Sequence, residues 1–287
     1  MVFGVQRPKN IYWQMGQNMH RGSTLPPKAI FIDIDGTLLS HTTGRVPKSA
    51  VQALQKARNH GILLFIATGR NNKEVGLVPG LEDFIFDGFM TMNGSLCYID
   101  NDVIFKNPLK QHTVAAVVDR ITNDPFPCIF AQENDLFISV IDEHIKSLQE
   151  MLSLPMPRQK DPAAALDSEI FQIAVTVNAQ QETFLRSLPM TKLTKWRDGC
   201  FDLVNDDVNK WEGITHVLRH FGLNPHEVAA IGDGDNDIEM LANAGFSVAM
   251  GNASDAAKSY AGYVTRHIDD DGFAYAIEQM LKSINHG

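Results

Sequence analysis

One stretch of this sequence decides the fold: Phe31-Ile32-Asp33-Ile34-Asp35-Gly36-Thr37-Leu38-Leu39. Apolar residues lead directly into two carboxylates, which predicts a buried strand that carries Asp33 and Asp35 at its end. The pattern recurs downstream, where the apolar run 228–231 leads into Gly232-Asp233-Gly234-Asp235-Asn236-Asp237. Carboxylates that meet at one edge of a sheet repel one another strongly unless a divalent cation neutralises them. The sequence therefore predicts a metal site and an anionic substrate.

The neighbouring segments predict a parallel sheet with helices between its strands. Residues 62–67 form a nearly continuous apolar run, typical of a strand buried on both faces, and the run ends in Thr68-Gly69-Arg70. A further short strand at 88–92 ends in Asn93-Gly94. After about residue 199 the alternation resumes, and Lys210 opens a helix that Gly222 ends. We therefore predict an α/β fold with a Rossmann-like, doubly wound parallel sheet.

The middle of the chain follows a different order and predicts an inserted α+β unit. Its expected helices and strands are helices near 114–121, 145–154 and 180–188, and strands near 129–131, 136–141, 170–177, 193–196 and 201–204. We predict that residues 108–198 form this unit as a cap domain, and that residues 28–107 and 199–287 form the core. Residues 1–27 are predicted to be an N-terminal tail.

Composition narrows the class of protein. The 287 residues are 44% hydrophobic and 21% charged, which is ordinary for a soluble globular protein. A net charge of −9 argues against a nucleic-acid partner, because phosphate backbones select a basic surface. No apolar stretch approaches the ~20 residues that cross a bilayer, so no membrane association is expected. The three scattered cysteines lack metal-site spacing and favour a reduced, cytoplasmic setting.

Taken as an ordered set, the motifs resemble the haloacid dehalogenase-like hydrolases, in particular the Cof-like branch with a type IIB cap. The resemblance covers nearly everything from residue 28 to residue 281. It rests on Asp33-x-Asp35-Gly36-Thr37-Leu38, Ala67-Thr68-Gly69-Arg70, Asn93-Gly94, Lys210, Gly232-Asp233-x-x-Asn236-Asp237, Val248-Ala249-Met250-Gly251-Asn252-Ala253 and Asp271-Gly272. It implies a phosphatase that hydrolyses a small phosphorylated metabolite, such as a sugar phosphate, with Mg²⁺ as cofactor.

The resemblance also implies catalytic roles. Asp33 matches the nucleophile, whose carboxylate attacks phosphorus to give an aspartyl-phosphate. Asp35 matches the general acid and base, which protonates the leaving alcohol and then deprotonates the attacking water. Thr68 would hold phosphate oxygens at the end of its strand, and Lys210 would neutralise the phosphate and the nucleophile together. A helix cap for Thr68 and an intrahelical ion pair for Lys210 are the structural alternatives.

The remaining expected contacts concern the metal and the substrate. Mg²⁺ would be held by the carboxylates of Asp33 and Asp233 and the main-chain carbonyl of Asp35, with Asp237 nearby. Phosphate would also be contacted by a polar set that comprises Gly69, Arg70, Asn93 and Asn236. Arg70 could equally be a solvated side chain. Lys195 is the rival of Lys210, but it belongs to the cap, where Lys195-Trp196-Arg197 either faces the substrate or forms a surface strand.

Two other functions stay open from the sequence. One is a sugar phosphomutase, which would pass the phosphoryl group to a second hydroxyl instead of water. The other is a binding protein that keeps the fold without the chemistry, although every matched catalytic position is intact. We expect a monomer or a small homo-oligomer.

Overall fold

Short apolar strands explain where the chain forms its larger sheet. The protein is described by a computed structural model of residues 26–100, 102–152 and 154–282. The expected tail at 1–27 lies outside the described residues, except for its last two positions. Residues Ala29 to Ile32 are completely buried, as expected for a strand covered on both faces. Among the described residues, no helix has the length and apolar character needed to cross a membrane.

The larger sheet has eight strands in the order β14-β13-β12-β1-β2-β3-β4-β5. β1 pairs in parallel with both β12 and β2, whereas β4 and β5 pair antiparallel at one edge. The strands are β1 (Ala29–Ile32), β2 (Leu63–Ala67), β3 (Gly88–Thr91), β4 (Leu96–Ile99), β5 (Asp102–Lys106), β12 (Val228–Gly232), β13 (Phe246–Ala249) and β14 (Tyr263–Val264). The predicted α/β fold with a parallel-dominated sheet is confirmed.

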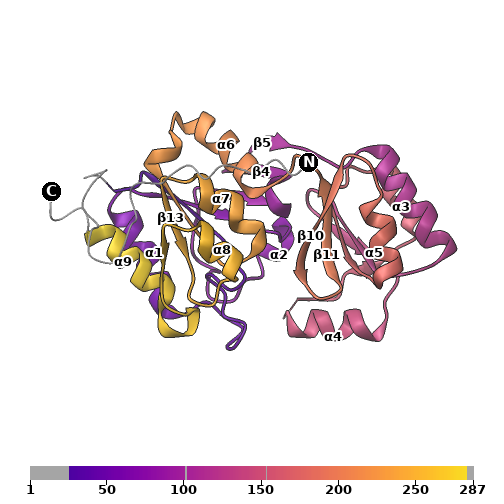
Figure 1. Cartoon of the computed structure of the whole chain (residues 1–287), viewed down its shortest axis with the longest axis horizontal. Coiled ribbons are helices and arrows are strands. Elements are labelled where there is room, and N and C mark those ends of the chain that lie inside the picture. Colours follow the sequence, from indigo (N-terminus) through magenta and orange to yellow (C-terminus); the bar gives the residue numbers. More distant parts are fainter. Residues whose placement is uncertain (1–25, 101, 153, 283–287) are drawn as a thin grey trace.

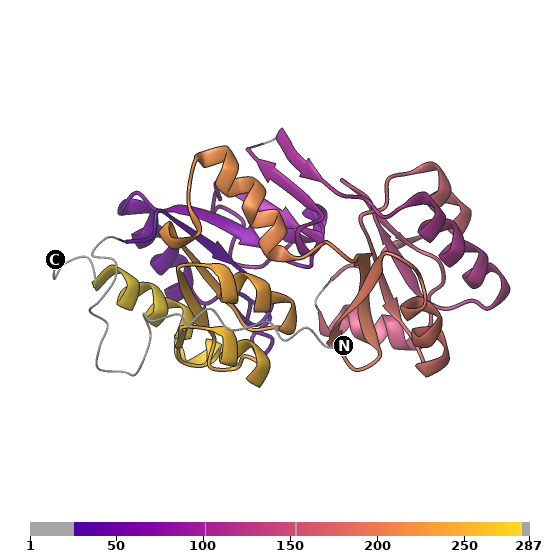
Figure 2. The same ribbon diagram turned by 45° about the horizontal axis from the view of Figure 1, so that its top comes forward.

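Helices cover both faces of this sheet, because the chain winds outward from β1 in two directions. On one face α1 (Lys48–Asn59) packs against α9 (Gly272–Lys282) and buries Ala50, Leu54 and Ala57. The other face carries α6 (Lys210–Phe221), α7 (Ile238–Asn243) and α8 (Asp255–Tyr260) (Figures 1 and 2). Shorter helical segments are α2 (Asn72–Val75), η1 (Met92–Gly94), η3 (Pro225–Glu227), η4 (Asp235–Asp237) and η5 (Ile268–Asp270).

The middle of the chain forms a second sheet with its own hydrophobic core. Its six strands lie in the order β10-β11-β9-β6-β7-β8. They are β6 (Cys128–Ala131), β7 (Leu136–Ile138), β8 (Arg158–Gln159), β9 (Gln172–Thr176), β10 (Thr191–Arg197) and β11 (Cys200–Asn205), with the helices α3 (Gln111–Asn123), α4 (Glu143–Met151), η2 (Pro162–Asp167) and α5 (Ala179–Arg186). Figure 1 shows the two sheets in adjacent lobes.

The boundary of the inserted unit lies further along the chain than predicted. The sequence analysis counted a strand near 201–204 with this unit but ended the unit at residue 198, whereas β11 (Cys200–Asn205) pairs with β9 and β10 in the six-stranded sheet. A tight turn between β10 and β11 explains this, because Gly199 has the positive φ of 73° that a short hairpin turn uses. The six-stranded sheet therefore continues to Asn205, and the chain returns to the larger sheet only through α6.

The six-stranded sheet lies next to the carboxyl ends of the parallel strands. Its edge strand β10 is in contact with η4, the short turn that follows β12. In Figure 1, β10 and β11 lie on the side of their lobe that faces α2 and the larger sheet. Residues from both lobes can therefore contribute to one site at this edge.

Candidate active site

Two parallel strands bring the acidic residues of the site together. Asp33 directly follows β1 and Asp233 directly follows β12, and these strands are hydrogen-bonded neighbours. The carboxyl ends of parallel neighbours lie at one edge of the sheet, so residues 200 positions apart in sequence become adjacent. The third carboxylate, that of Asp237, comes from the end of η4 and is completely buried.

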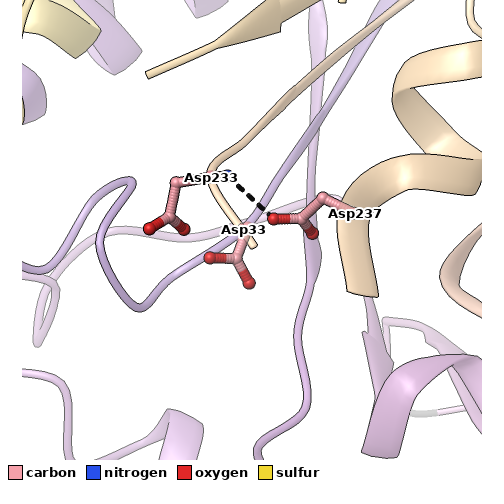
Figure 3. Close-up of side chains that lie close together, drawn as sticks. All are labelled: Asp33, Asp233 and Asp237. Atoms are coloured by element: carbon pink, nitrogen blue, oxygen red, sulfur yellow. Dashed lines mark hydrogen bonds between the residues drawn. The ribbon is translucent and has the colours of Figure 1, made fainter. Parts of the chain in front are cut away.

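The carboxylates of Asp33, Asp233 and Asp237 form one cluster. Each offers an oxygen atom, and these three atoms all lie within 4.8 Å of one another. Figure 3 shows the side chains turned toward a shared space. Burial raises the pKa of Asp33 and of Asp233, and repulsion between the carboxylates raises both further. Such a cluster stores unfavourable electrostatic energy that a cation would relieve.

One cation of the chain already reaches into this cluster. The Lys210 ammonium lies 2.6 Å from Oδ1 of Asp33 and 2.6 Å from Oδ1 of Asp237, and the side chain is completely buried. Burial opposes the charged form of Lys210, but the two carboxylates outweigh it and raise its pKa. The intrahelical pair considered for Lys210 is absent from its described contacts, because α6 begins at this residue. Lys195, its rival, forms an ion pair with Asp198 instead.

The second acidic residue of the N-terminal motif is held by an arginine. Arg70 donates from Nε and Nη2 to the two carboxylate oxygens of Asp35, at 2.8 Å and 2.7 Å. Arg70 is almost completely buried, whereas the Asp35 side chain is one-third exposed. Arg70 is therefore not a solvated side chain, because it is buried and orients Asp35; its expected contact with phosphate stays a prediction. A two-point pair of this kind fixes direction as well as charge.

Thr68 and Gly69 line the site from the end of β2. Thr68 directly follows β2 and is completely buried, and its hydroxyl accepts a hydrogen bond from the backbone N–H of Arg70 at 3.1 Å. Gly69 has no side chain, and a Cβ there would lie 3.4 Å from the amide of Asn93 and from a carboxylate oxygen of Asp202. Gly69 therefore lies close to side chains of both sheets.

Amide side chains connect the loop that carries Asn236 to the six-stranded sheet. Asn236 donates from Nδ2 to Oδ1 of Asn93 at 3.0 Å. Asn93 donates in turn to Oδ2 of Asp202 and to Oε1 of Gln172, both at 2.9 Å. Gln172 completes this hydrogen-bond network by donating to the carbonyl of Gly69 at 3.1 Å. Asn93 and Asn236, both expected to contact phosphate, are thus joined by a hydrogen bond that was not predicted, and Asp202 and Gln172 were not anticipated at the site.

Asp233 is supported by residues whose role sequence reasoning missed. Thr37 donates to one of its carboxylate oxygens at 3.3 Å, and Asn252 donates to the other at 3.3 Å. Gly36, with φ of 78°, passes so close to the Asp233 carboxylate that a Cβ would collide with it. Both Gly36 and Asn252 lie within sequence motifs that the resemblance includes. The motifs therefore marked these two residues, but they did not indicate that the residues support Asp233.

A cavity of about 260 Å³ lies beside this site, between the two lobes. Arg70 forms part of its wall, next to Asp35. The other walls come from the loop after β1 and from the end of α4, with Leu39 to Gly44, Leu77, Pro79, Met151 and Leu152 as lining residues. Leu77 and Met151 are each 46% exposed, which gives the outer part of the cavity an apolar rim.

The chemistry of the cluster fits a hard divalent cation. Its donors are carboxylate oxygens only, which Mg²⁺ prefers, and the buried cluster carries more negative charge than Lys210 alone can balance. The expected carbonyl ligand from Asp35 stays a prediction. The arrangement as a whole can bind an anion beside a cation. The Asp33 carboxylate, at the end of β1, lies next to that position and is chemically able to attack the anion.

Comparisons with known proteins agree with this geometry. A family model described as haloacid dehalogenase-like hydrolase matches residues 30–277, which include every charged residue of the site. A Bacillus subtilis protein named as a candidate phosphatase is 31% identical over 254 residues, 88% of this chain and 97% of that protein. Phosphoglycolate phosphatase of Methanobrevibacter smithii is 26% identical over 258 residues, 88% and 98% of the two chains. A solved structure of a subclass IIB sugar phosphatase superposes with a TM-score of 0.79 at 34% identity, covering 88% and 98%.

Proposed function

This chain belongs to the haloacid dehalogenase-like hydrolases and is a phosphatase, and on this basis we propose that it hydrolyses small phosphate monoesters through an aspartyl-phosphate at Asp33, with Mg²⁺ bound. The observation that carries the proposal is the position of the Lys210 ammonium, 2.6 Å from both Asp33 and Asp237 inside the carboxylate cluster. Such a lysine favours the ionised form of Asp33, which a nucleophile requires, against the burial that raises its pKa, and it offers charge to an incoming phosphate.

The first half-reaction transfers the phosphoryl group to the protein. A carboxylate oxygen of Asp33 attacks phosphorus, the bond from phosphorus to the ester oxygen breaks, and the leaving oxygen takes a proton from Asp35. Both oxygens of Asp35 accept hydrogen bonds from Arg70, so Asp35 must release at least one of them to carry that proton. The Thr68 hydroxyl and the backbone of Gly69 bind phosphate oxygens on the opposite side.

The second half-reaction returns the protein to its starting state. Asp35 accepts a proton from a water molecule, whose oxygen attacks phosphorus, and the bond to Asp33 breaks to release inorganic phosphate. Bound Mg²⁺, held by Asp33, Asp233 and Asp237, would supply positive charge for the phosphate oxygens. The acceleration required is large, up to about 10²¹-fold for phosphate monoesters, and electrostatic stabilisation by preorganised charges is its main source.

We also propose that the six-stranded sheet acts as the cap of this site. Support comes from its contacts to the core, where Gln172 and Asp202 approach Gly69 and Asn93. In this arrangement the leaving group of the substrate would lie between the lobes, in or beside the cavity that Arg70 lines. A closed cap would exclude water other than the reacting molecule.

The proposal is tested by assaying a panel of phosphate monoesters with the purified protein, with Mg²⁺ and with chelator. We expect turnover that requires the metal and that falls by at least about 10³-fold in Asp33→Asn, because the nucleophile is lost. Asp198→Asn, which removes a carboxylate whose side chain is 97% exposed, is the matched control and should keep normal turnover. Undiminished turnover in chelator and in Asp33→Asn would refute the proposal. Transfer to a second hydroxyl in place of phosphate release would instead indicate a mutase.

A further inference from the structure

The six-stranded sheet presents a polar patch to the catalytic edge of the core. Side chains alternate across β11, so Phe201 and Leu203 enter the core beneath α3 and α5 while Asp202 points to the opposite face. Part of that opposite face is covered by α4, whose Ile145 and Leu148 pack on Cys200. The part that α4 leaves uncovered carries Asp202 and Gln172, which contact the core instead.

Asp202 lies close to the groups that would hold the substrate. Its Oδ2 accepts a hydrogen bond of 2.9 Å from Asn93, and it lies 3.4 Å from the position that a Cβ on Gly69 would take. Gly69 stands between Thr68, proposed to bind phosphate, and Arg70, which holds Asp35. The Asp202 carboxylate therefore lies next to the turn that joins the proposed phosphate contact to the arginine that holds Asp35.

A carboxylate at this position is electrostatically costly. Only 7% of Asp202 is exposed, and burial raises its pKa to about 7 against the hydrogen bond from Asn93. The negative charge of Glu74 raises the pKa further, while Lys210 and the Trp196 indole act in the opposite direction. Neither half-reaction above uses Asp202. An acidic residue beside an anionic substrate weakens the binding of that substrate. Its presence is therefore useful only if the repulsion excludes some ligands more than others.

We propose that Asp202 determines specificity by charge: its carboxylate rejects phosphate esters whose leaving group carries a second negative charge, and it accepts leaving groups that are neutral or cationic and can donate a hydrogen bond. This inference rests on the proposed function, because it places the leaving group between the lobes. A buried like charge is a strong means of exclusion, since a ligand carboxylate cannot be screened there by water. Donor hydroxyls or amines would instead pair with the same oxygens.

A matched pair of ligands tests this charge selection. 2-Hydroxyethyl phosphate and 2-phosphoglycolate have the same number of carbon atoms, but one ends in a hydroxyl and the other in a carboxylate. Their dissociation constants are measured by titration calorimetry in Mg²⁺ at about pH 8.5, where Asp202 is ionised. Asp33→Asn is the background, so that neither ligand is turned over. We expect 2-phosphoglycolate to bind at least about tenfold more weakly than its partner.

Two further variants on this background separate charge from structure. Asp202→Asn keeps an oxygen that can accept from Asn93 but removes the charge, so the affinity ratio of the two ligands should fall toward one. Asp198→Asn removes the same charge from the turn of the same hairpin, where it is exposed, and should leave the ratio unchanged. Equal or tighter binding of 2-phosphoglycolate in the Asp33→Asn background would overturn the inference, and so would an unchanged ratio in Asp202→Asn.

A failure of this inference can be distinguished from a failure of the proposed function. Binding is measured without turnover, so a failure of charge selection leaves the hydrolysis assay unaffected. If Asp202→Asn does not fold, the ratio in the Asp33→Asn background alone still decides, because the inference requires selection against the carboxylate ligand there. One relative is named a phosphoglycolate phosphatase, and this chain is predicted to differ from it in that preference.

Discussion

The Lys210 ammonium lies 2.6 Å from Oδ1 of Asp33, although 177 residues separate the two in the sequence. Both side chains are almost fully buried, and the same ammonium also contacts Asp237. This buried cation stabilises the folded chain and, in the proposed function, also favours the ionised form of the nucleophile Asp33. The predictions below separate these two contributions.

Removing this cation should destabilise the metal-free protein. In Lys210→Ala the two buried carboxylates of Asp33 and Asp237 lose their described ammonium partner, and breaking a buried pair in this way costs about 3–5 kcal/mol of unfolding free energy. Chemical denaturation in chelator measures the change. Lys146→Ala, which breaks an exposed pair with Glu143, is the control and should leave the denaturation midpoint nearly unchanged, because water screens such a pair. Equal midpoints for Lys210→Ala and the native chain would contradict this account.

The stabilisation by Mg²⁺ should grow with pH. The pKa of Asp33 is raised from 3.8 to about 7 and that of Asp233 to about 9, so the folded metal-free protein binds protons that the unfolded chain releases. Its stability therefore falls as pH rises from about 4 through these values. A bound cation removes the cause, and the melting temperature with Mg²⁺ minus that in chelator should be larger at pH 8.5 than at pH 6. A larger difference at pH 6 would show that the carboxylates are not the ligands.

Losing the arginine that orients Asp35 should affect turnover more than phosphate binding. In Arg70→Ala the Asp35 carboxylate loses both hydrogen bonds, and displacement of a proton donor typically lowers kcat by about 10²-fold. Lysine cannot form the two-point pair, so Arg70→Lys should restore activity only in part. Inhibition by inorganic phosphate is measured alongside. If the inhibition constant rises as much as kcat falls, then Arg70 contacts phosphate directly.

A methyl group at Gly36 should damage the metal site specifically. Gly36 has φ of 78°, and a Cβ there would collide with the Asp233 carboxylate. Gly61 has nearly the same φ, 76°, but a Cβ there meets nothing within 4 Å. Both alanine variants carry the backbone strain of a positive φ, of order 1 kcal/mol, and only Gly36→Ala displaces Asp233. We expect Mg²⁺ affinity to fall at least about tenfold in Gly36→Ala alone; comparable affinities in both variants would contradict this.

The sequence predicts the fold and the acidic cluster because both follow from local rules. Apolar runs that end in Asp33 and Asp233 specify parallel strands, and parallel strands place their carboxyl ends at one edge. The helix that Lys210 opens is equally local, because Gly222 ends it and Asn209 caps it. The pairing of Lys210 with Asp33 came from the family resemblance and not from local pattern, and the contact of Lys210 with Asp237 was not predicted.

The sequence did not predict the side-chain contacts between residues that lie far apart in the chain. No periodicity relates Arg70 to Asp35, because their contact depends on how two loops approach each other in space. Asp202 was missed for a related reason: an isolated acidic residue in an apolar strand does not reveal which sheet the strand joins. Once β11 is placed in the six-stranded sheet, alternation of side chains assigns Asp202 to the face that meets the core.

The central claim is that Asp33 itself carries the phosphoryl group. Rapid acid quench during turnover of a phosphate monoester with Mg²⁺, followed by borohydride reduction, converts an aspartyl-phosphate to homoserine, which peptide mass spectrometry locates. The account predicts homoserine at position 33 in the native chain and none in Asp33→Asn. Turnover without homoserine at position 33, or with homoserine at another aspartate, would contradict it.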